Sequence, residues 1–233
     1  TLGVKRLKDF PNIESLRLSG SITVSPKQME LIAQLPRLRK LDLSGSQVGD
    51  DHIEALLPLS PTLEYLNLER TQITGAALRQ IADLTNLQEL NFRWTALGKW
   101  DYLRRPHAKT GIIMKASTGL MRRLQPLQKL RTLRVYTEDV GAFDGIQALP
   151  QLQTLELVAG GLRPLTASDF ESIAQLPKLR SLRLSSPPDV EHISLLRPLT
   201  CLRELSFPGD DKISSELSSQ LQRHLPRTRF GLR

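Results

Sequence analysis

The chain of 233 residues is poor in cysteine and in aromatic residues, and it has no long hydrophobic run. Its single cysteine, Cys201, cannot form an internal disulfide or a thiolate metal cage. No Asn-x-Ser/Thr glycosylation acceptor occurs, so both features favour a reducing, cytosolic environment. No apolar stretch approaches the roughly 18–20 residues of a membrane span, so we expect no membrane-spanning segment.

The first residues also lack two common features. They contain neither the apolar stretch of a secretory signal nor an initiator methionine. We therefore expect a piece of a longer protein, in which residues 1–12 are the end of a preceding repeat or cap. The net charge is +8, which keeps an anionic partner under consideration but says nothing about the fold.

One leucine pattern, Leu-x-x-Leu-x-Leu with small variations, recurs along the chain. Its copies start 22 to 27 residues apart, except for one step of 43. They span 13–18, 38–43, 63–68, 87–92, 130–135, 152–157, 179–184 and 202–207, with a degenerate ninth copy at 227–232. Within each copy, leucines alternate with polar residues, which is typical of a half-buried strand. Segments with helical spacing of apolar residues follow the copies, for example 26–33 and 76–82.

This pattern resembles the leucine-rich repeat family, and the resemblance covers nearly the whole chain. One repeat cannot bury both its strand face and its helix face alone, so neighbouring repeats must stack. We predict an α/β fold of about 8–9 repeats, a single curved solenoid over residues 1–233. A parallel sheet would line the concave side and helices the convex side, with residues 214–233 as the C-terminal cap.

Several residues predict where helices begin and how turns are held. Ser25 followed by Pro26, and Thr166 with Asp169, are typical of helix N-termini. The family often places asparagine three residues after the third leucine, whereas this chain has other residues there in all eight copies. In the first four repeats these are Ser21, Ser46, Thr71 and Thr95. We expect their hydroxyl groups to replace the amide hydrogen bonds, although more weakly.

The residues between the leucines should face the concave surface, because side chains alternate along a strand. In the middle of the chain, arginine and aromatic residues of adjacent repeats come together there. They are Tyr65, Arg93, Arg134 and Tyr136, with Arg70 and Trp94 just beyond the strands. Tyr, Trp and Arg are enriched at binding hot spots, so we predict a protein-binding patch. The alternative is that Trp94 folds onto the leucine layer and the tyrosines simply pack together.

The step of 43 residues indicates an insertion over about 99–117, after which residues 119–124 provide the usual outer helix. Segment 98–129 contains eight basic residues and one acid, Asp101. The insertion could fold over the patch, contact phosphate or nucleic acid, or remain a solvated loop. We expect the first, with Trp100, Tyr102, Arg104 and Arg105 reaching from it toward a protein target. Nucleic acid is not expected as the partner.

Catalytic constellations are missing. The four histidines have no metal-ligand spacing, and the HEXXH, Gly-x-Ser-x-Gly and phosphate-loop signatures do not occur. Cys201 directly precedes Leu202, so we expect a small buried core residue. The sequence therefore predicts no catalytic residue, no metal and no cofactor in this chain.

Residues 71–82, TQITGAALRQIA, resemble the repeats of bacterial GALA-type effectors and F-box-associated repeats. The resemblance implies the target-recognition part of a type III effector, secreted by a bacterium and acting inside a host cell on a host protein. In such families a separate region engages the ubiquitination machinery. Any ubiquitin ligase activity of the full protein would therefore lie outside these 233 residues.

Overall fold

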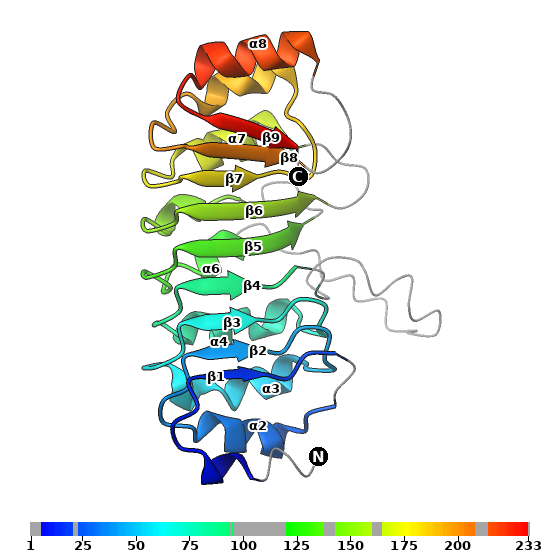
Figure 1. Cartoon of the computed structure of the whole chain (residues 1–233), viewed down its shortest axis with the longest axis vertical. Coiled ribbons are helices and arrows are strands. Elements are labelled where there is room, and N and C mark those ends of the chain that lie inside the picture. Colours follow the sequence, from blue (N-terminus) through cyan, green and yellow to red (C-terminus); the bar gives the residue numbers. More distant parts are fainter. Residues whose placement is uncertain are drawn as a thin grey trace, which may run out of the picture.

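The structure, a computed structural model, describes residues 6–20, 23–93, 95, 120–137, 143–159, 165–207 and 214–232. In this part of the chain, nine parallel strands form one sheet in sequence order (Figure 1). They are β1 (Ser15–Arg17), β2 (Lys40–Asp42), β3 (Tyr65–Asn67), β4 (Glu89–Asn91), β5 (Thr132–Thr137), β6 (Thr154–Ala159), β7 (Ser181–Arg183), β8 (Glu204–Phe207) and β9 (Arg229–Leu232). Each strand pairs with the next, as stacked repeats require.

The register of the sheet follows the leucine pattern. The middle leucines of neighbouring copies pair directly, so that Leu90 of β4 lies beside Leu133 of β5 although the insertion separates them in sequence. At the C-terminal end, Phe230 takes the same place beside Leu205. The strands predicted from the repeats are therefore confirmed, including the degenerate copy at 227–232.

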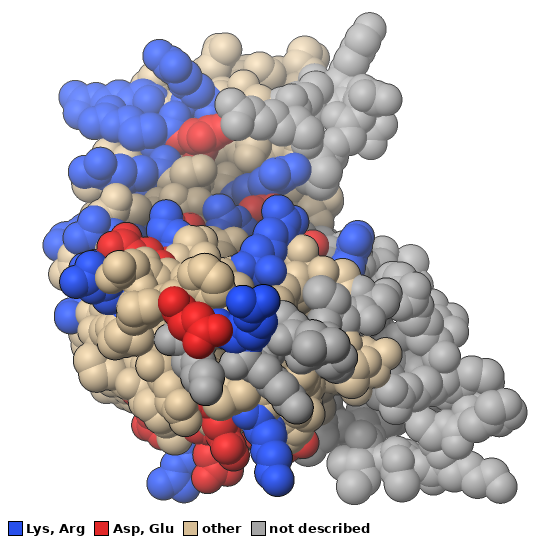
Figure 2. Space-filling view, turned by 60° about the horizontal axis from the view of Figure 1, so that its bottom comes forward, with Lys and Arg blue, Asp and Glu red and all other residues tan. Residues whose placement is uncertain are grey.

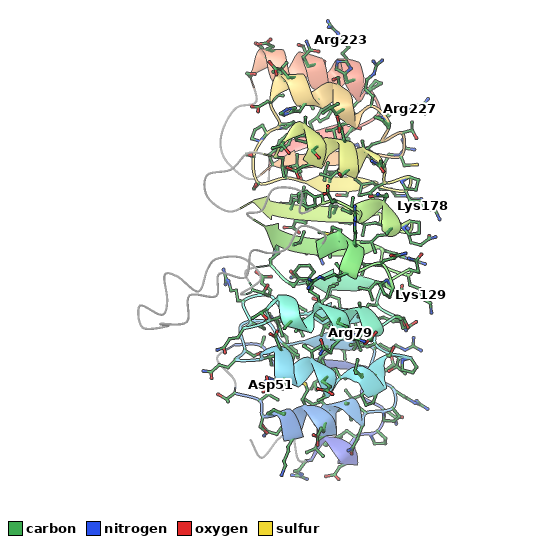
Figure 3. The ribbon with its side chains drawn as sticks, turned by 180° about the vertical axis from the view of Figure 1, so that it is seen from behind. Asp51, Arg79, Lys129, Lys178, Arg223 and Arg227 are labelled. Atoms are coloured by element: carbon green, nitrogen blue, oxygen red, sulfur yellow. The ribbon has the colours of Figure 1, made fainter. Side chains whose placement is uncertain are left out.

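Helical segments cover the opposite face of the sheet, as the view from behind shows (Figure 3). The α-helices are α2 (Pro26–Ala33), α3 (Asp50–Glu54), α4 (Leu78–Asp83), α6 (Leu120–Arg123), α7 (Ala167–Ala174) and α8 (Ser215–His224). The 3₁₀ helices are η1 (Leu7–Asp9), η2 (Leu57–Leu59), η3 (Gly75–Ala77), η4 (Ile146–Ala148) and η5 (Val190–Leu196). The predicted arrangement, with strands on one side and helices on the other, is confirmed.

Both predicted helix starts are present. The Ser25 hydroxyl accepts a hydrogen bond from the backbone N–H of Gln28 at 3.3 Å, and the Ser25 N–H donates to the Gln28 side chain at 2.9 Å. At α7 the backbone N–H of Thr166 donates to Oδ2 of Asp169 at 2.9 Å. These side chains accept hydrogen bonds from backbone N–H groups that lack a partner at the start of a helix.

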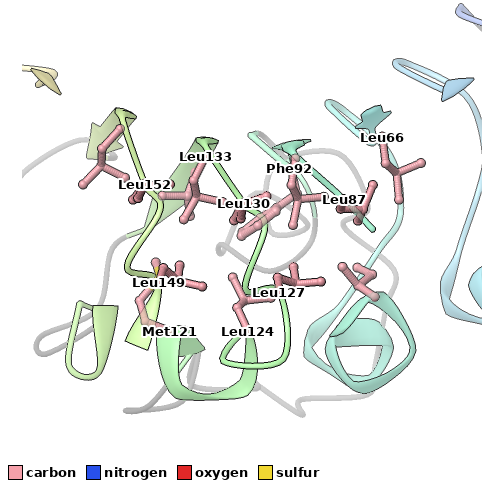
Figure 4. Packing of buried hydrophobic residues seen from close by; sticks show 14 of the residues in the cluster. Leu66, Leu87, Phe92, Met121, Leu124, Leu127, Leu130, Leu133, Leu149 and Leu152 are labelled. Carbon is pink, nitrogen blue, oxygen red and sulfur yellow. The ribbon is translucent and has the colours of Figure 1, made fainter. Parts of the chain in front are cut away.

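The hydrophobic core lies between the sheet and the helical layer (Figure 4). Leu133 on the sheet is fully buried, as is Phe92, which replaces the third leucine of the fourth copy. Met121 and Leu124 close the core from the helical side, so the segment after the insertion serves as the usual outer layer. The stacked apolar side chains of neighbouring repeats form a continuous leucine column. Because this column determines which side chains point inward, it also determines which residues lie on the open face of the sheet, the side away from the helices.

Hydroxyl groups replace the asparagine amides at the turns, as predicted. Ser46 donates to the carbonyl of Leu43 at 2.6 Å, and Thr71 donates to that of Leu68 at 2.6 Å. Thr95 donates to the carbonyl of Phe92 at 3.0 Å. All three side chains are buried, so these bonds satisfy hydroxyl groups that lie away from solvent. The carbonyls of Leu43 and Leu68 also accept from the backbone N–H groups of Ser46 and Thr71. Ser21 lies outside the described residues.

The prediction that Cys201 is buried is wrong, because its side chain is exposed. It occupies the place immediately before the first leucine of its copy, in a turn that leads to the next strand. Arg37 and Lys178 occupy the same place in other repeats and are also exposed. The turn itself, rather than the residue type, decides the exposure of this position.

The two ends of the stack differ. At the C-terminal end, Leu217 and Leu221 of α8 are buried against the core. At the N-terminal end, Leu7 of η1 packs on the core as a half-buried residue, and Phe10 is exposed. The cap roles of residues 1–12 and 214–233 remain predictions.

Candidate functional site

The Arg93 side chain connects three repeats on the open face of the sheet. Arg93 follows β4, and its Nη2 lies 3.0 Å from Oε2 of Glu69, which follows β3. Its Nη1 donates a hydrogen bond to Oε1 of Glu156 in β6. The guanidinium is therefore held between two carboxylates that come from opposite sides of it along the stack.

Glu156 is the centre of this group of charges. Besides Arg93, its carboxylate contacts Arg134 of β5, whose Nε is 3.3 Å away, and Arg183 of β7, whose Nη1 is 3.7 Å away. Arg134 also lies 3.8 Å from Oε2 of Glu89 in β4. The Glu156 side chain is only 11% exposed, so its charge depends on these arginines. We call the following six residues the central charge network: Glu69, Glu89, Arg93, Arg134, Glu156 and Arg183.

Two buried asparagines position the network. The amide of Asn91 donates to Oε2 of Glu69 at 3.0 Å, and its carbonyl accepts from the backbone N–H of Arg93 at 3.1 Å. Asn67 accepts from the backbone N–H of Glu69 at 3.0 Å. The strands and these amides therefore fix Glu69 and Arg93 before any partner arrives.

Tyr65 at the start of β3 borders the network. Burial raises the pKa of its phenol above the usual 10.0, the carboxylates of Asp42 and Glu89 raise it further, and Arg134 and a hydrogen bond with Asn67 lower it. Its phenol therefore stays protonated at neutral pH. A half-buried ring that carries a hydroxyl can supply both contact area and a directed hydrogen bond.

Arg70 has a left-handed backbone, with φ of 56°. Gly20 and Gly45 occupy the equivalent place in the first two repeats, with φ of 97° and 71°. The N–H of Arg70 donates to the carbonyl of Arg93 at 3.0 Å, which continues the sheet ladder beyond the strands. This conformation costs a residue other than glycine about 1–2 kcal/mol. The Arg70 side chain is exposed, so burial of the side chain does not offset that cost. Such local strain suggests a functional reason for the arginine.

The structure brings together the part of the predicted patch whose side chains it describes. These residues are Tyr65, Arg70, Arg93 and Arg134, in the repeats of β3, β4 and β5. Tyr136 lies in β5, two residues beyond Arg134, and its side chain is outside the described part. The other predicted residues, together with the insertion 99–117, also lie outside it: Trp94, Trp100, Tyr102, Arg104 and Arg105. Their roles remain predictions.

The acidic half of the network was missed by the sequence analysis, as was Arg183. A signal was present in the repeat alignment. Glu69 and Arg93 occupy the same place in consecutive copies, and so do Arg134 and Glu156. Neighbouring strands are about 4.8 Å apart, so opposite charges at one place in consecutive copies predict ion pairs across the sheet.

The described residues offer charged groups for contacts on the open face of the sheet. Among them, no group of three or more His, Cys, Asp or Glu could hold a metal ion. None of the helices given above is long and apolar enough to span a bilayer. The network contains carboxylates and guanidinium groups only, which can make ion pairs and charge-assisted hydrogen bonds to a partner.

Comparison with known proteins agrees with this architecture. Residues 34–57 match the family described as Leucine Rich repeat. The chain is similar in structure to internalin C2 from Listeria monocytogenes, with 20% identity over 95% of this chain and 81% of that chain, and a TM-score of 0.55. The fold is a leucine-rich repeat solenoid. At this level of identity the similarity supports the fold alone.

Two further comparisons add little to the leucine-rich repeat assignment. Leiomodin-1 actin-binding site 2 is 19% identical, with 64% of this chain and 86% of that chain covered, at a TM-score of 0.46. That score is too low to support any inference from it. The comparison with curated proteins finds no match. In this leucine-rich repeat solenoid, function must therefore be argued from the surface itself.

Proposed function

We propose that this leucine-rich repeat solenoid is a protein-interaction domain that binds its partner on the open face of the sheet. The observation that supports this most is the arrangement of three arginines around Glu156, with Tyr65 beside them. Arg and Tyr are the residues that most often anchor protein interfaces. Ion pairs with Glu156 already hold the three arginines, which reduces the entropy lost on binding.

The charge balance of the network indicates what kind of partner it fits. Its three arginines and three glutamates cancel, so a bare polyanion would meet carboxylates as well as guanidinium groups. A polypeptide that carries both acidic and basic side chains can pair with each sign. Arg134 and Arg183 keep 30% and 41% of their side-chain surface exposed, and Glu89 keeps 45%. These three side chains are the ones available to such a partner.

We further propose that the chain is the target-recognition part of a larger bacterial effector that acts on a host protein. The resemblance of residues 71–82 to effector repeats supports this. On this proposal any ubiquitin ligase activity resides elsewhere in the full protein. The chain alone, mixed with ubiquitin, activating enzyme and conjugating enzyme, should build no ubiquitin chains, and chain formation would contradict the proposal.

Site-specific photo-crosslinking tests the binding face. A photoreactive amino acid in place of Tyr65 should crosslink the partner in extracts of host cells. The same amino acid in place of Arg79, which lies on the helical side (Figure 3), should not. Crosslinking of one protein from both positions with equal yield, or from Arg79 alone, would contradict binding by the open face.

A further inference from the structure

The edge of the sheet where the strands begin carries a second charged surface. Backbone hydrogen bonds place one residue of each repeat in a single row along this edge, just before the strand begins. We call this row the file. The N–H of Arg180 donates to the carbonyl of Gln153 at 2.8 Å, and the N–H of Arg203 donates to that of Arg180 at 2.7 Å. Arg131 precedes Gln153 in the same file. Consecutive members therefore belong to adjacent strands, about 4.8 Å apart.

The two halves of this file differ in charge. In the N-terminal half, Glu14, Arg39 and Glu64 alternate in sign, and Nη1 of Arg39 lies 2.6 Å from Oε1 of Glu64. In the C-terminal half the charged members are Arg131, Arg180 and Arg203, without an acid between them. The single arginine of the N-terminal half is thus paired with an acid, whereas the C-terminal half stays positive.

Four more basic residues flank the C-terminal half of the file. They are Lys129, Lys178 and Arg227 in the turns before the strands, and Arg229 at the start of β9. We call these four and the three arginines of the file the basic edge. All seven residues are exposed. Within the described part of the chain, none of them forms an ion pair with an acidic side chain.

Neutral partners orient the two lysines without cancelling their charge. Nζ of Lys129 donates to Oδ1 of Asn86 at 2.8 Å, and Nζ of Lys178 donates to Oε1 of Gln151 at 2.8 Å. Seen from behind, Lys129, Lys178 and Arg227 follow one edge of the molecule (Figure 3). Basic side chains also gather on the corresponding side of the C-terminal half in the space-filling view (Figure 2). The basic edge is thus a positive row supplied by the repeats of β5, β7, β8 and β9, and the repeat of β6 between them is neutral there.

We propose that the basic edge binds the phosphate backbone of a double-stranded nucleic acid. A duplex carries one negative charge per about 1.7 Å of its axis, and binding releases its condensed counterions. An extended acidic polypeptide has at most one charge per about 3.3 Å, so it gives a weaker electrostatic gain. A row of unpaired cations therefore fits a phosphate backbone best.

The composition of the edge argues against other partners. Phe10 is the one large hydrophobic side chain among the described residues that is exposed, and it lies at the opposite end of the stack. A protein partner would find no aromatic anchor on the basic edge, and a membrane would find no apolar side chain to insert. The edge also presents no aromatic platform on which the bases of a single strand could stack.

Nucleic acid was not expected from the sequence, in which the basic insertion is the one dense cluster of positive charge. The basic edge lies outside residues 99–117, and its members come from four repeats, so only the fold assembles them. The site is also separate from the open face proposed for protein binding. Loss of either activity would leave the other untouched, which distinguishes the two proposals.

Fluorescence anisotropy with labelled DNA and RNA duplexes tests the proposal. About five phosphate contacts predict that the logarithm of the binding constant falls with the logarithm of salt concentration at a slope of about −4.5. The triple variant Arg180→Gln, Arg203→Gln and Arg229→Gln should flatten this slope by about 2.7. At about 150 mM salt that corresponds to a loss of affinity of order 100-fold.

A matched variant controls for net charge. Lys27→Gln, Arg79→Gln and Arg223→Gln remove three exposed charges from the helices α2, α4 and α8, and we expect an affinity within about threefold of wild type. Circular dichroism checks that both variants fold. If the triple variant does not fold, Arg203→Gln alone should flatten the slope by about 0.9.

Several results would overturn the proposal. They are no binding of either duplex by the wild type, a flat salt response, equal losses in the basic-edge and control variants, or an unchanged slope in the basic-edge variant. Tighter binding of phosphatidylserine vesicles or of polyglutamate than of either duplex would also overturn it, since the occupant would then be a lipid surface or an acidic protein.

Discussion

The guanidinium of Arg93 and the carboxylate of Glu156 are joined by a hydrogen bond, although 63 residues separate them in the sequence. Strand β5 lies between the repeats that carry them, and its Arg134 contacts the same carboxylate. The insertion falls within this interval, yet β4 pairs directly with β5. The open face is therefore continuous across the insertion, and the central charge network is built on that continuity.

Replacing Glu156 by glutamine should destabilise the solenoid by about 2 kcal/mol. The substitution keeps the shape of the side chain but leaves three arginines around a neutral amide in a largely buried place. Chemical denaturation followed by circular dichroism measures the change in unfolding free energy. Glu64→Gln is the control, because the Arg39–Glu64 pair lies closer to solvent and should contribute less than about 1 kcal/mol. Equal losses in both variants would show that Glu156 is an ordinary surface charge.

Replacing Arg70 by glycine should raise the unfolding free energy by about 0.5–1 kcal/mol. Its φ of 56° is favourable for glycine and costly for other residues. Arg70→Ala also removes the side chain but keeps the strain, so it should give no such gain. Thermal unfolding of both variants separates the two effects. A destabilised Arg70→Gly variant would mean that the arginine side chain supports the fold.

Replacing Leu133 by alanine should cost about 3 kcal/mol. This residue is fully buried at the centre of the leucine column, so the change leaves a cavity that the neighbouring repeats cannot fill. Leu16→Ala is the matched change in β1, where the leucine is only half-buried, and we expect about 1 kcal/mol. Similar costs at both places would contradict the picture of a continuous core that weakens toward the first repeat.

Stability should fall above pH 10 in a way that depends on Tyr65. The pKa of this phenol is raised above 10.0 in the folded chain, so the folded state keeps a proton that the unfolded state loses. Stability must therefore decrease as the pH rises from 10.0 through the folded pKa. Unfolding at about pH 9 and about pH 11 should show a smaller loss for Tyr65→Phe than for wild type. Parallel losses would indicate that Tyr65 ionises as it does in the unfolded chain.

The leucine repeats predict most of the fold because the spacing of the leucines indicates which side chains of each repeat are buried. The nine strands follow from it, and the helix starts at Ser25 and Thr166 follow from their capping residues. The exposure of Cys201 did not follow from the pattern. Cysteine is commonly a buried residue, but the place before the first leucine of a copy lies in an exposed turn. In other repeats that place carries Arg37 and Lys178, which shows that it belongs to the surface.

The candidate site was predicted only in part, for a different reason. Arginines and tyrosines stand out in a sequence as binding residues, whereas glutamates look like ordinary solvated surface. Glu156 becomes important only because Arg93, Arg134 and Arg183 converge on it from other strands. The repeat alignment contains the pairs between consecutive copies, but the reach of Arg93 across β5 to Glu156 depends on side-chain conformations, which a single sequence does not contain.

The most direct test of the account is calorimetric titration of the partner that is crosslinked from the place of Tyr65. Binding of the purified partner should weaken about 30-fold in Arg134→Gln, the loss expected for a hot spot worth about 2 kcal/mol. It should be unchanged in Arg79→Gln on the helical side. An unchanged affinity in a folded Arg134→Gln variant would contradict the claim that the open face of the sheet is the binding surface.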